Sequence, residues 1–136
     1  FEDTLSCKEK LIRISSSAKN HMSILPDYFP DYVKRRIKLG IKMHGMHPDD
    51  DIGRMIVRTS PPLDEPILIP QNKYSLSTDM AIYDNKIGYM SSEGGGYAII
   101  IENDVLAEDM KKIFDLAWEQ AKRLSKISTK TIKNKT

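Results

Sequence analysis

Two histidines and three aspartates form the densest group of potential metal ligands in the sequence. His44 and His47 lie three residues apart, and Asp49–Asp51 follow directly after Pro48. Imidazole and carboxylate groups at close spacing can bind zinc or iron. However, the residues around the histidines have the pattern of a strand, which places residues three apart on opposite faces. We therefore predict no metal site, with the aspartates solvated in a loop, and we expect no cofactor.

A run of basic residues is the second group with chemical potential. Lys34, Arg35, Arg36 and Lys38, with Lys42 close behind, could hold phosphate or nucleic acid. More often, such a run is the solvated face of an amphipathic helix. We keep the first four residues as candidate nucleic-acid contacts and the solvated face as the alternative.

Two further motifs carry less chemistry. Gly94–Gly96 is not followed by a lysine and precedes a strand, so it lacks the context of a phosphate-binding loop and predicts a turn. Cys7 has no evident activating partner, which favours a structural thiol. A single cysteine excludes an internal disulfide and, with no signal peptide in the sequence, fits a cytoplasmic protein.

Length and composition are typical of one globular domain. The chain has 136 residues, of which 40% are hydrophobic and 29% charged, enough apolar residues to build a core. The longest apolar run, Tyr97–Ile101, is far shorter than the roughly 20 residues of a membrane-spanning helix. We therefore expect no membrane partner.

The net charge of +2 divides unevenly along the chain. Of the 21 basic residues, six follow Glu119, which leaves 15 basic against 19 acidic residues in 1–119, a net charge of −4. A DNA-binding face needs clustered Lys and Arg to displace counterions from phosphates. The acidic body is therefore poor material for a DNA-binding face, whereas the basic end could contact DNA, a membrane or an acidic partner, or simply be a solubilising helix end.

Hydrophobic periodicity predicts alternating elements in the first third of the chain. Residues 27–39 have the apolar spacing of a helix that Gly40 ends, and residues 41–46 resemble a strand. The stretch from Leu11 to Ala18 has one apolar stripe at helical spacing, and Met22–Leu25 could form a short strand.

The rest of the chain predicts an irregular segment, a short strand at Leu68 and Ile69, three further strands and one long helix. Three aspartates and three prolines make residues 48–66 a candidate surface loop or flap, although its apolar residues could support a short helix. Residues 78–102 have the pattern of strands joined by turns, and Tyr97–Glu102 looks like the most buried of them. A helix then begins near Asp104, and its apolar stripe places Trp118 in the core.

The pattern of elements predicts the α/β class, with mixed α+β features. We expect a mixed β-sheet flanked by helices, a long C-terminal helix, and two parts of unequal size. Residues 1–124 form the domain, and residues 125–136 form a basic, flexible tail.

Three passages resemble the regulatory domain of TrmB-like transcriptional regulators. They are a helix leading through an Arg and a Gly-Ile step into a strand, a hairpin, and the closing helix, which here correspond to Tyr32–Ile41, Ile82–Ile87 and Phe114–Glu119. That regulatory domain has a phospholipase D-like fold and follows a winged-helix DNA-binding domain. The resemblance covers most of the chain, but each passage is short.

The phospholipase D superfamily has an active-site motif against which the hairpin can be compared. The motif is His-x-Lys, four residues, then Asp, with Gly-Ser at the far end of the next strand. If Asp84 takes the Asp position, then Ser77 replaces His, Asp79 replaces Lys, and Ser91-Ser92 replaces Gly-Ser. A serine without a neighbouring base is a poor nucleophile, and an aspartate would repel a phosphate. The resemblance therefore implies no phosphodiesterase activity.

The leading hypothesis is a non-catalytic effector-sensing and dimerisation domain of a TrmB-like regulator. DNA binding would then belong to a winged-helix domain upstream of this sequence, and the expected partners are a second copy and a small-molecule effector. We expect an effector pocket where Ser77, Asp79, Asp84 and Ser91 converge, with ordinary strand-end polarity as the alternative. A small phospholipase D-type phosphodiesterase with altered residues is the second hypothesis. Direct nucleic-acid binding through the basic run and tail is the third.

Overall fold

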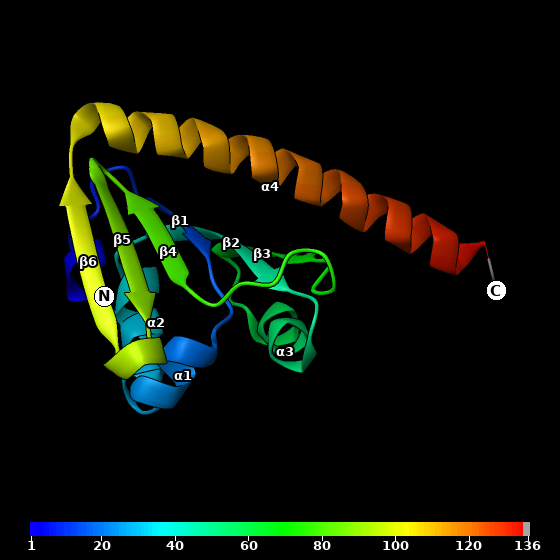
Figure 1. Ribbon diagram of the computed structural model, residues 1–136, viewed down its shortest axis with the longest axis horizontal. Coiled ribbons are helices and arrows are strands. Elements are labelled where there is room, and N and C mark those ends of the chain that lie inside the picture. The colour runs from blue at the N-terminus through cyan, green and yellow to red at the C-terminus, as the bar shows by residue number, and fades with distance from the viewer. Residues whose placement is uncertain (135–136) are drawn as a thin grey trace.

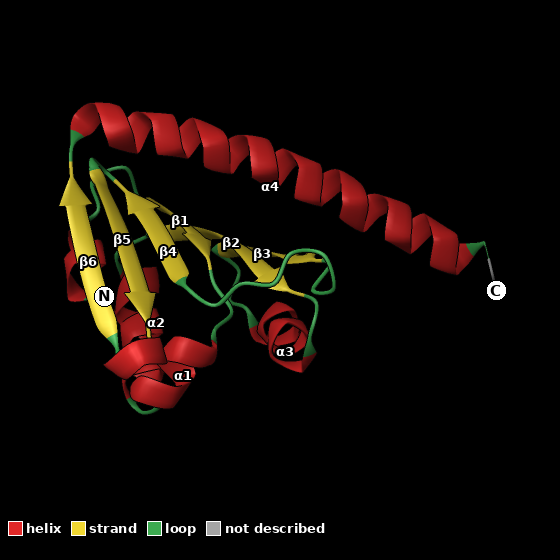
Figure 2. Cartoon of the chain, viewed as in Figure 1, coloured by secondary structure: helices red, strands yellow, loops and turns green. Residues whose placement is uncertain are grey.

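Six strands form one mixed sheet in the order β3-β2-β1-β4-β5-β6 (Figure 2). The computed structural model describes residues 1–134, and for His21 and residues 127–133 it describes the backbone alone. The first three strands run parallel, whereas β4 lies antiparallel to β1 and continues into an antiparallel meander with β5 and β6. The strands are β1 Leu11–Ser15, β2 Lys42–Pro48, β3 Asp64–Ile69, β4 Asp79–Tyr83, β5 Lys86–Ser91 and β6 Tyr97–Glu102.

Helices lie on both faces of this sheet (Figure 1). Two of them, α1 (Lys19–Ile24) and α2 (Tyr28–Lys38), connect β1 to β2, and α3 (Asp51–Thr59) connects β2 to β3. These three lie on one face, and the long helix α4 (Asp104–Lys133) crosses the other. Parallel strands require such crossovers, and the crossovers cover the sheet.

Local sequence explains where α2 and α3 begin and end. Gly40 follows α2 with φ of 70°, a left-handed conformation that glycine adopts without strain. The Asp50 carboxylate caps α3 by accepting a hydrogen bond from the Gly53 N–H at 2.8 Å. A side chain at Gly53 would meet the Pro48 carbonyl oxygen at 2.0 Å, so glycine allows α3 to approach the end of β2.

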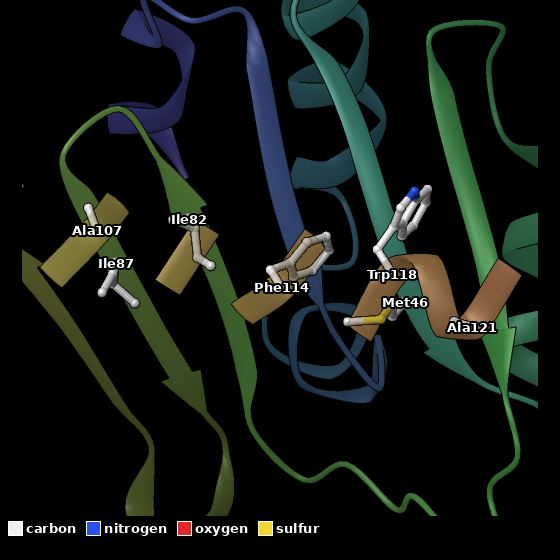
Figure 3. Packing of buried hydrophobic residues seen from close by; sticks show 7 residues of the cluster. All are labelled: Met46, Ile82, Ile87, Ala107, Phe114, Trp118 and Ala121. Carbon is white, nitrogen blue, oxygen red and sulfur yellow. The ribbon is translucent and has the colours of Figure 1, made fainter. Parts of the chain in front are cut away.

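One apolar stripe of α4 forms the larger core. Ala107, Phe114, Trp118 and Ala121 are buried at helical spacing (Figure 3). They pack against residues of β2, β4 and β5, namely Met46, Ile82 and Ile87. The predicted burial of Trp118 is therefore confirmed. A smaller core of Cys7, Ile12, Ile41 and Tyr83 lies on the opposite face of the sheet.

The structure confirms the mixed α/β fold with its long C-terminal helix and corrects several local predictions. Residues 11–15 form a strand, because Ile12 and Ile14 point inward at a strand period and are buried in the middle of the sheet. Residues 19–24 are helical, so the short strand predicted at Met22–Leu25 was wrong. The predicted loop at residues 48–66 contains α3, the short helix that its apolar residues allowed.

The end of the sheet also differs from expectation. Every residue of β6, the strand predicted as the most buried, is exposed, because β6 is an edge strand. Helix α4 extends to Lys133 and therefore includes residues 125–133 of the predicted tail, whereas Lys135 and Thr136 lie outside the described residues. Within residues 1–134, no helix has the length and apolar character that crossing a membrane requires.

Candidate functional site

A buried polar network lies where β1 ends and β4 begins. Ser16, directly after β1, is fully buried and donates from Oγ to Asp79 Oδ1 at 2.9 Å. The same Oγ accepts the Ala18 backbone N–H at 2.9 Å, which holds Ala18 at a positive φ of 62°. His47 Nδ1, from the neighbouring strand β2, lies 3.0 Å from the Ser16 carbonyl oxygen. Polar side chains from three strands therefore meet at the end of the sheet where ligands commonly bind in open α/β folds.

Asn20 connects this network to the two loops above it. Its Nδ2 donates to the Ser77 carbonyl at 3.1 Å, and its Oδ1 accepts from both the N–H and the Oγ of Ser92, at 3.0 and 2.7 Å. Asn20 itself is 3% exposed, so its amide group is satisfied by these partly buried bonds. Asn20 therefore fastens the 70–78 loop and the end of β5 to α1.

The structure brings only part of the predicted pocket together. Ser77 and Asp79 lie beside Asn20 and Ser16, and Asp79 pairs with Met90 in the ladder of β4 and β5. Ser91 is the next residue along β5, so its side chain turns to the opposite face from Asp79. Its Oγ is buried and accepts the Glu93 N–H at 3.2 Å. Asp79 and Ser91 therefore share one end of the sheet but not one pocket.

Asp84 lies at the opposite end of β4, away from the other three predicted residues. Its carboxylate accepts the backbone N–H groups of Lys8 and Glu9 at 2.9 and 3.1 Å, and the Cys7 thiol lies 3.5 Å away. Burial alone would raise the pKa of Asp84, but the hydrogen bonds from Lys8, Glu9 and Cys7 together with the charge of Lys111 leave the pKa below its ordinary value. Asp84 therefore anchors the N-terminal segment to the β4–β5 turn.

Cys7, beside Asp84, has the environment of a structural thiol. It is fully buried in the smaller core. Burial raises the pKa of its thiol, and the neighbouring Asp84 carboxylate adds to the rise. The thiol is therefore protonated and unreactive at neutral pH.

The predicted basic patch divides into exposed and buried members. Lys34 and Lys38 are exposed on α2, and Arg35 forms ion pairs with Glu2 and Asp31 at 2.6 and 2.7 Å. Arg36, by contrast, is fully buried, so it cannot contact a nucleic acid on the surface. The prediction that all four residues share one binding surface is therefore wrong for Arg36.

Arg36 forms a buried ion pair that the sequence reading missed. Its Nη2 donates to Asp64 Oδ2 at 2.7 Å, and its Nη1 donates to the Ile41 carbonyl at 2.7 Å. These bonds connect α2 to the starts of β2 and β3. One signal in the sequence could have shown it: Arg36 shares a helical stripe with Tyr32 and Val33, and therefore lies on the inward face of α2.

The two histidines lie on opposite faces of β2, as the strand pattern predicted. His44 stacks on Trp118 under α4, with ring centroids 4.8 Å apart, and burial lowers its pKa. His47 faces the opposite side and contacts the Ser16 carbonyl. Among the side chains that the structure describes, no three of His, Cys, Asp and Glu gather closely enough to hold a metal ion.

A cavity of about 210 Å³ lies between α2, α3 and the parallel strands. Its walls are largely apolar, with Val33 from α2, Ile56 from α3 and Met43 from β2 among them. Arg36, Asp64 and His47 contribute polar atoms. None of the predicted ligand-binding residues lines this cavity.

Comparison with known proteins gives a fold and no closer relationship. No known family model matches the chain, and a search of the curated proteins finds no match. Among solved structures, the chain resembles TrmBL2, described as an archaeal chromatin protein with a novel mode of DNA binding. The TM-score is 0.56 at 14% sequence identity, over 82% of this chain and 41% of the TrmBL2 chain. The chain thus shares a fold with less than half of TrmBL2.

Proposed function

We propose that this chain is a non-catalytic effector-sensing and dimerisation domain of a TrmB-like transcriptional regulator. DNA binding would belong to a winged-helix domain upstream of the sequence. The fold shared with TrmBL2, a DNA-binding chromatin protein, supports this assignment, as does the net charge of −4 on residues 1–119. A net negative charge disfavours binding to DNA phosphates, so residues 1–119 are better suited to a sensing domain than to a DNA-binding domain.

One observation carries the non-catalytic part of the proposal. Asp79 stands where a phospholipase D motif has its lysine, and it is 5% exposed and hydrogen-bonded to Ser16. A buried carboxylate at that position would repel a phosphate oxygen. Ser77, in place of the nucleophilic histidine, is exposed and contributes its backbone carbonyl to Asn20. These positions hold the loops together, which favours a structural role for them.

Exposed apolar residues support the dimerisation part. Ile99 and Ile100 on β6 are 52% and 57% exposed, and Val105 and Leu116 on α4 are 73% and 74% exposed. An apolar edge strand leaves unpaired backbone groups beside apolar side chains, and proteins usually cover such an edge. A second copy can pair with it through the same residues around a two-fold axis.

A phosphodiester assay combined with a mass measurement tests the proposal. We expect no hydrolysis of bis(p-nitrophenyl) phosphate above background, with or without divalent metals, and twice the monomer mass by light scattering. Turnover that Ser77→Ala abolishes would instead establish the phosphodiesterase alternative. A monomer at high micromolar concentration would overturn the dimerisation part.

Direct nucleic-acid binding predicts a different result. The chain alone would then bind a random duplex at low salt, and the affinity would fall steeply as salt increases. We expect no such binding, because Arg36 is buried and Arg35 is paired with acidic residues. Salt-sensitive binding lost in the Lys34→Ala/Lys38→Ala double variant would support the alternative.

A further inference from the structure

The long helix α4 has a second apolar stripe, on the face that points away from the sheet. Val105, Ile113 and Leu116 are 73%, 58% and 74% exposed, whereas Phe114 and Trp118, on the stripe that packs against the sheet, are buried. At about 100° per residue, the three exposed side chains lie within about 80° of one another around the helix axis. The outer face of a surface helix is normally charged or polar, so large apolar side chains there indicate a partner on that side.

The outer face of α4 also has the side-chain arrangement that receives a second helix. A shallow hollow on this face is lined by Ile113, Leu116, Ala117 and Gln120, and it continues to Arg123. The first four residues follow the spacing i, i+3, i+4 and i+7, so they surround one point on the helix surface. Four residues of one helix form such a hole in a coiled coil, where a side chain of the facing helix fills it. The shape of this surface is therefore suited to a helical partner.

The distribution of charge along α4 indicates which helix fits. From Asp104 to Glu119 the sequence has five acidic and two basic residues, a net charge of −3, and from Gln120 to Lys133 it has five basic and no acidic residues, a net charge of +5. Two copies of α4 in the same direction would bring like charges together. Two antiparallel copies would instead place each acidic half beside a basic half, which is electrostatically favourable. The helix is therefore complementary to itself in the antiparallel direction.

We infer that α4 pairs with α4 of a second copy, antiparallel, through its outer apolar stripe. The two-fold axis then passes at the level of residues 120–123, where the acidic half meets the basic half. Glu119 and Lys126 are seven residues apart on one flank of the stripe and both are exposed, so Glu119 of each copy faces Lys126 of the other. The inference rests on the proposed dimerisation, and it assigns the dimer interface to α4 instead of the edge strand β6.

Analytical ultracentrifugation of two matched variants tests the stripe. Ile113→Lys places a charge in the inferred interface, whereas Val57→Lys adds the same charge at a residue of α3 that is 40% exposed and distant from α4. Both side chains are exposed in the monomer, so circular dichroism should show that both variants fold. We expect the dimer dissociation constant to rise at least tenfold in Ile113→Lys and to stay unchanged in Val57→Lys. Equal dissociation constants in the two variants would contradict the interface.

Reversing the flanking charges tests the antiparallel direction. Glu119→Lys and Lys126→Glu should each raise the dissociation constant about threefold or more, since each places like charges opposite one another in both halves of the dimer. The double variant Glu119→Lys/Lys126→Glu restores opposite charges between the copies, so its dissociation constant should return to about that of the original chain. In a parallel dimer the two positions do not face each other. A double variant that adds the effects of the single variants would therefore overturn the antiparallel pairing.

The same measurements separate this inference from the proposed dimerisation. A dimer whose dissociation constant is unchanged in Ile113→Lys, but raised in Ile99→Lys on β6, overturns the inference and leaves the dimerisation intact. A chain that stays monomeric at high micromolar concentration overturns both. A dimer that is weakened by Ile113→Lys and restored by the double charge reversal supports both.

Discussion

The parallel and antiparallel halves of the sheet are covered to different extents. Strands β1–β3 have α2 and α3 on one face and α4 on the other, and the connections between parallel strands supply two of these helices. The connections between β4, β5 and β6 are short and bring no α-helix with them, since the β5–β6 connection contains only the 3-10 turn Glu93–Gly95. Coverage therefore decreases toward β6, where all six residues are exposed. The connections along the chain therefore cover the parallel half, β1–β3, on both faces and leave the antiparallel half, β4–β6, exposed at its edge. We call these the closed half and the open half of the sheet.

The two halves also differ in how their polar groups are paired. In the antiparallel half, Asp79 is held by Ser16 and Asp84 by backbone N–H groups. In the parallel half, the Arg36–Asp64 pair has one unsatisfied donor and one unsatisfied acceptor beside a cavity. The unpaired atoms of the parallel half are closed off from solvent, whereas the open half exposes the backbone and apolar side chains of its edge strand, where a partner chain can pair.

Removing Trp118 should have the largest effect on stability. The side chain is 4% exposed and packs between His44 of β2 and Phe114 of α4. We expect Trp118→Ala to lower the free energy of unfolding by about 3–5 kcal/mol in urea denaturation, because it opens a cavity under α4. Leu116→Ala, on the same helix but 74% exposed, should cost less than about 0.5 kcal/mol. Equal losses would show that α4 packs differently.

Breaking the buried ion pair should come next. Asp64→Ala leaves the Arg36 guanidinium buried with only the Ile41 carbonyl as partner. We expect a loss of about 3 kcal/mol in the same measurement. Asp31→Ala removes an exposed partner of Arg35 and should cost about 0.5 kcal/mol.

A double variant distinguishes the pair's charge from its packing. Arg36→Met with Asp64→Leu replaces both ions by apolar side chains, so it should be within about 1 kcal/mol of the original chain. If the double variant is as unstable as Asp64→Ala, then the shape of the pair matters more than the unpaired charge.

The sequence predicts the strongly periodic elements and misses those defined by their neighbours. The helix at residues 27–39 and the long helix carrying Trp118 appear at nearly the predicted positions, because their apolar spacing is regular. Leu11–Ser15 has apolar residues compatible with either a helix or a strand. Only its place between β2 and β4 makes it a strand, which is a tertiary effect.

The site was predicted less well than the fold, for two physical reasons. Motif counting placed Asp84 with Ser77 and Asp79, but five residues of strand separate the two ends of β4. Composition treated Arg36 as one charge in a solvated run, whereas its partner Asp64 is 28 residues away in the chain. Helical spacing with Tyr32 and Val33 indicates that Arg36 turns inward, but nothing in the sequence identifies Asp64 as its partner.

Lowering the pH should reduce the stability of the open half, because Asp84 becomes protonated. Because its folded pKa lies below the ordinary value, Asp84 stabilises the fold fully above about pH 4 and loses that contribution as the pH falls through the lower folded value. We expect Asp84→Asn to cost about 1 kcal/mol at pH 7 and to make the remaining acid unfolding less steep. Asp49→Asn, at an exposed pair with Arg54, should leave the acid profile nearly unchanged. An unchanged profile for Asp84→Asn would show that the N-terminal segment is held by other contacts.

Charges placed on β6 should change association with little effect on folding. Ile99 and Ile100 point to opposite faces of the edge strand and are both more than half exposed, so Ile99→Lys and Ile100→Lys should each cost about 0.5 kcal/mol or less. If two copies pair edge to edge, both variants should raise the dimer dissociation constant by tenfold or more in analytical ultracentrifugation. If instead a partner packs on one face, then one substitution should act and the other should not. Glu102→Lys, at the exposed end of the same strand, controls for charge alone. Dimers unaffected by either isoleucine substitution would place the interface elsewhere, and the comparison of open and closed halves would then lose its functional meaning.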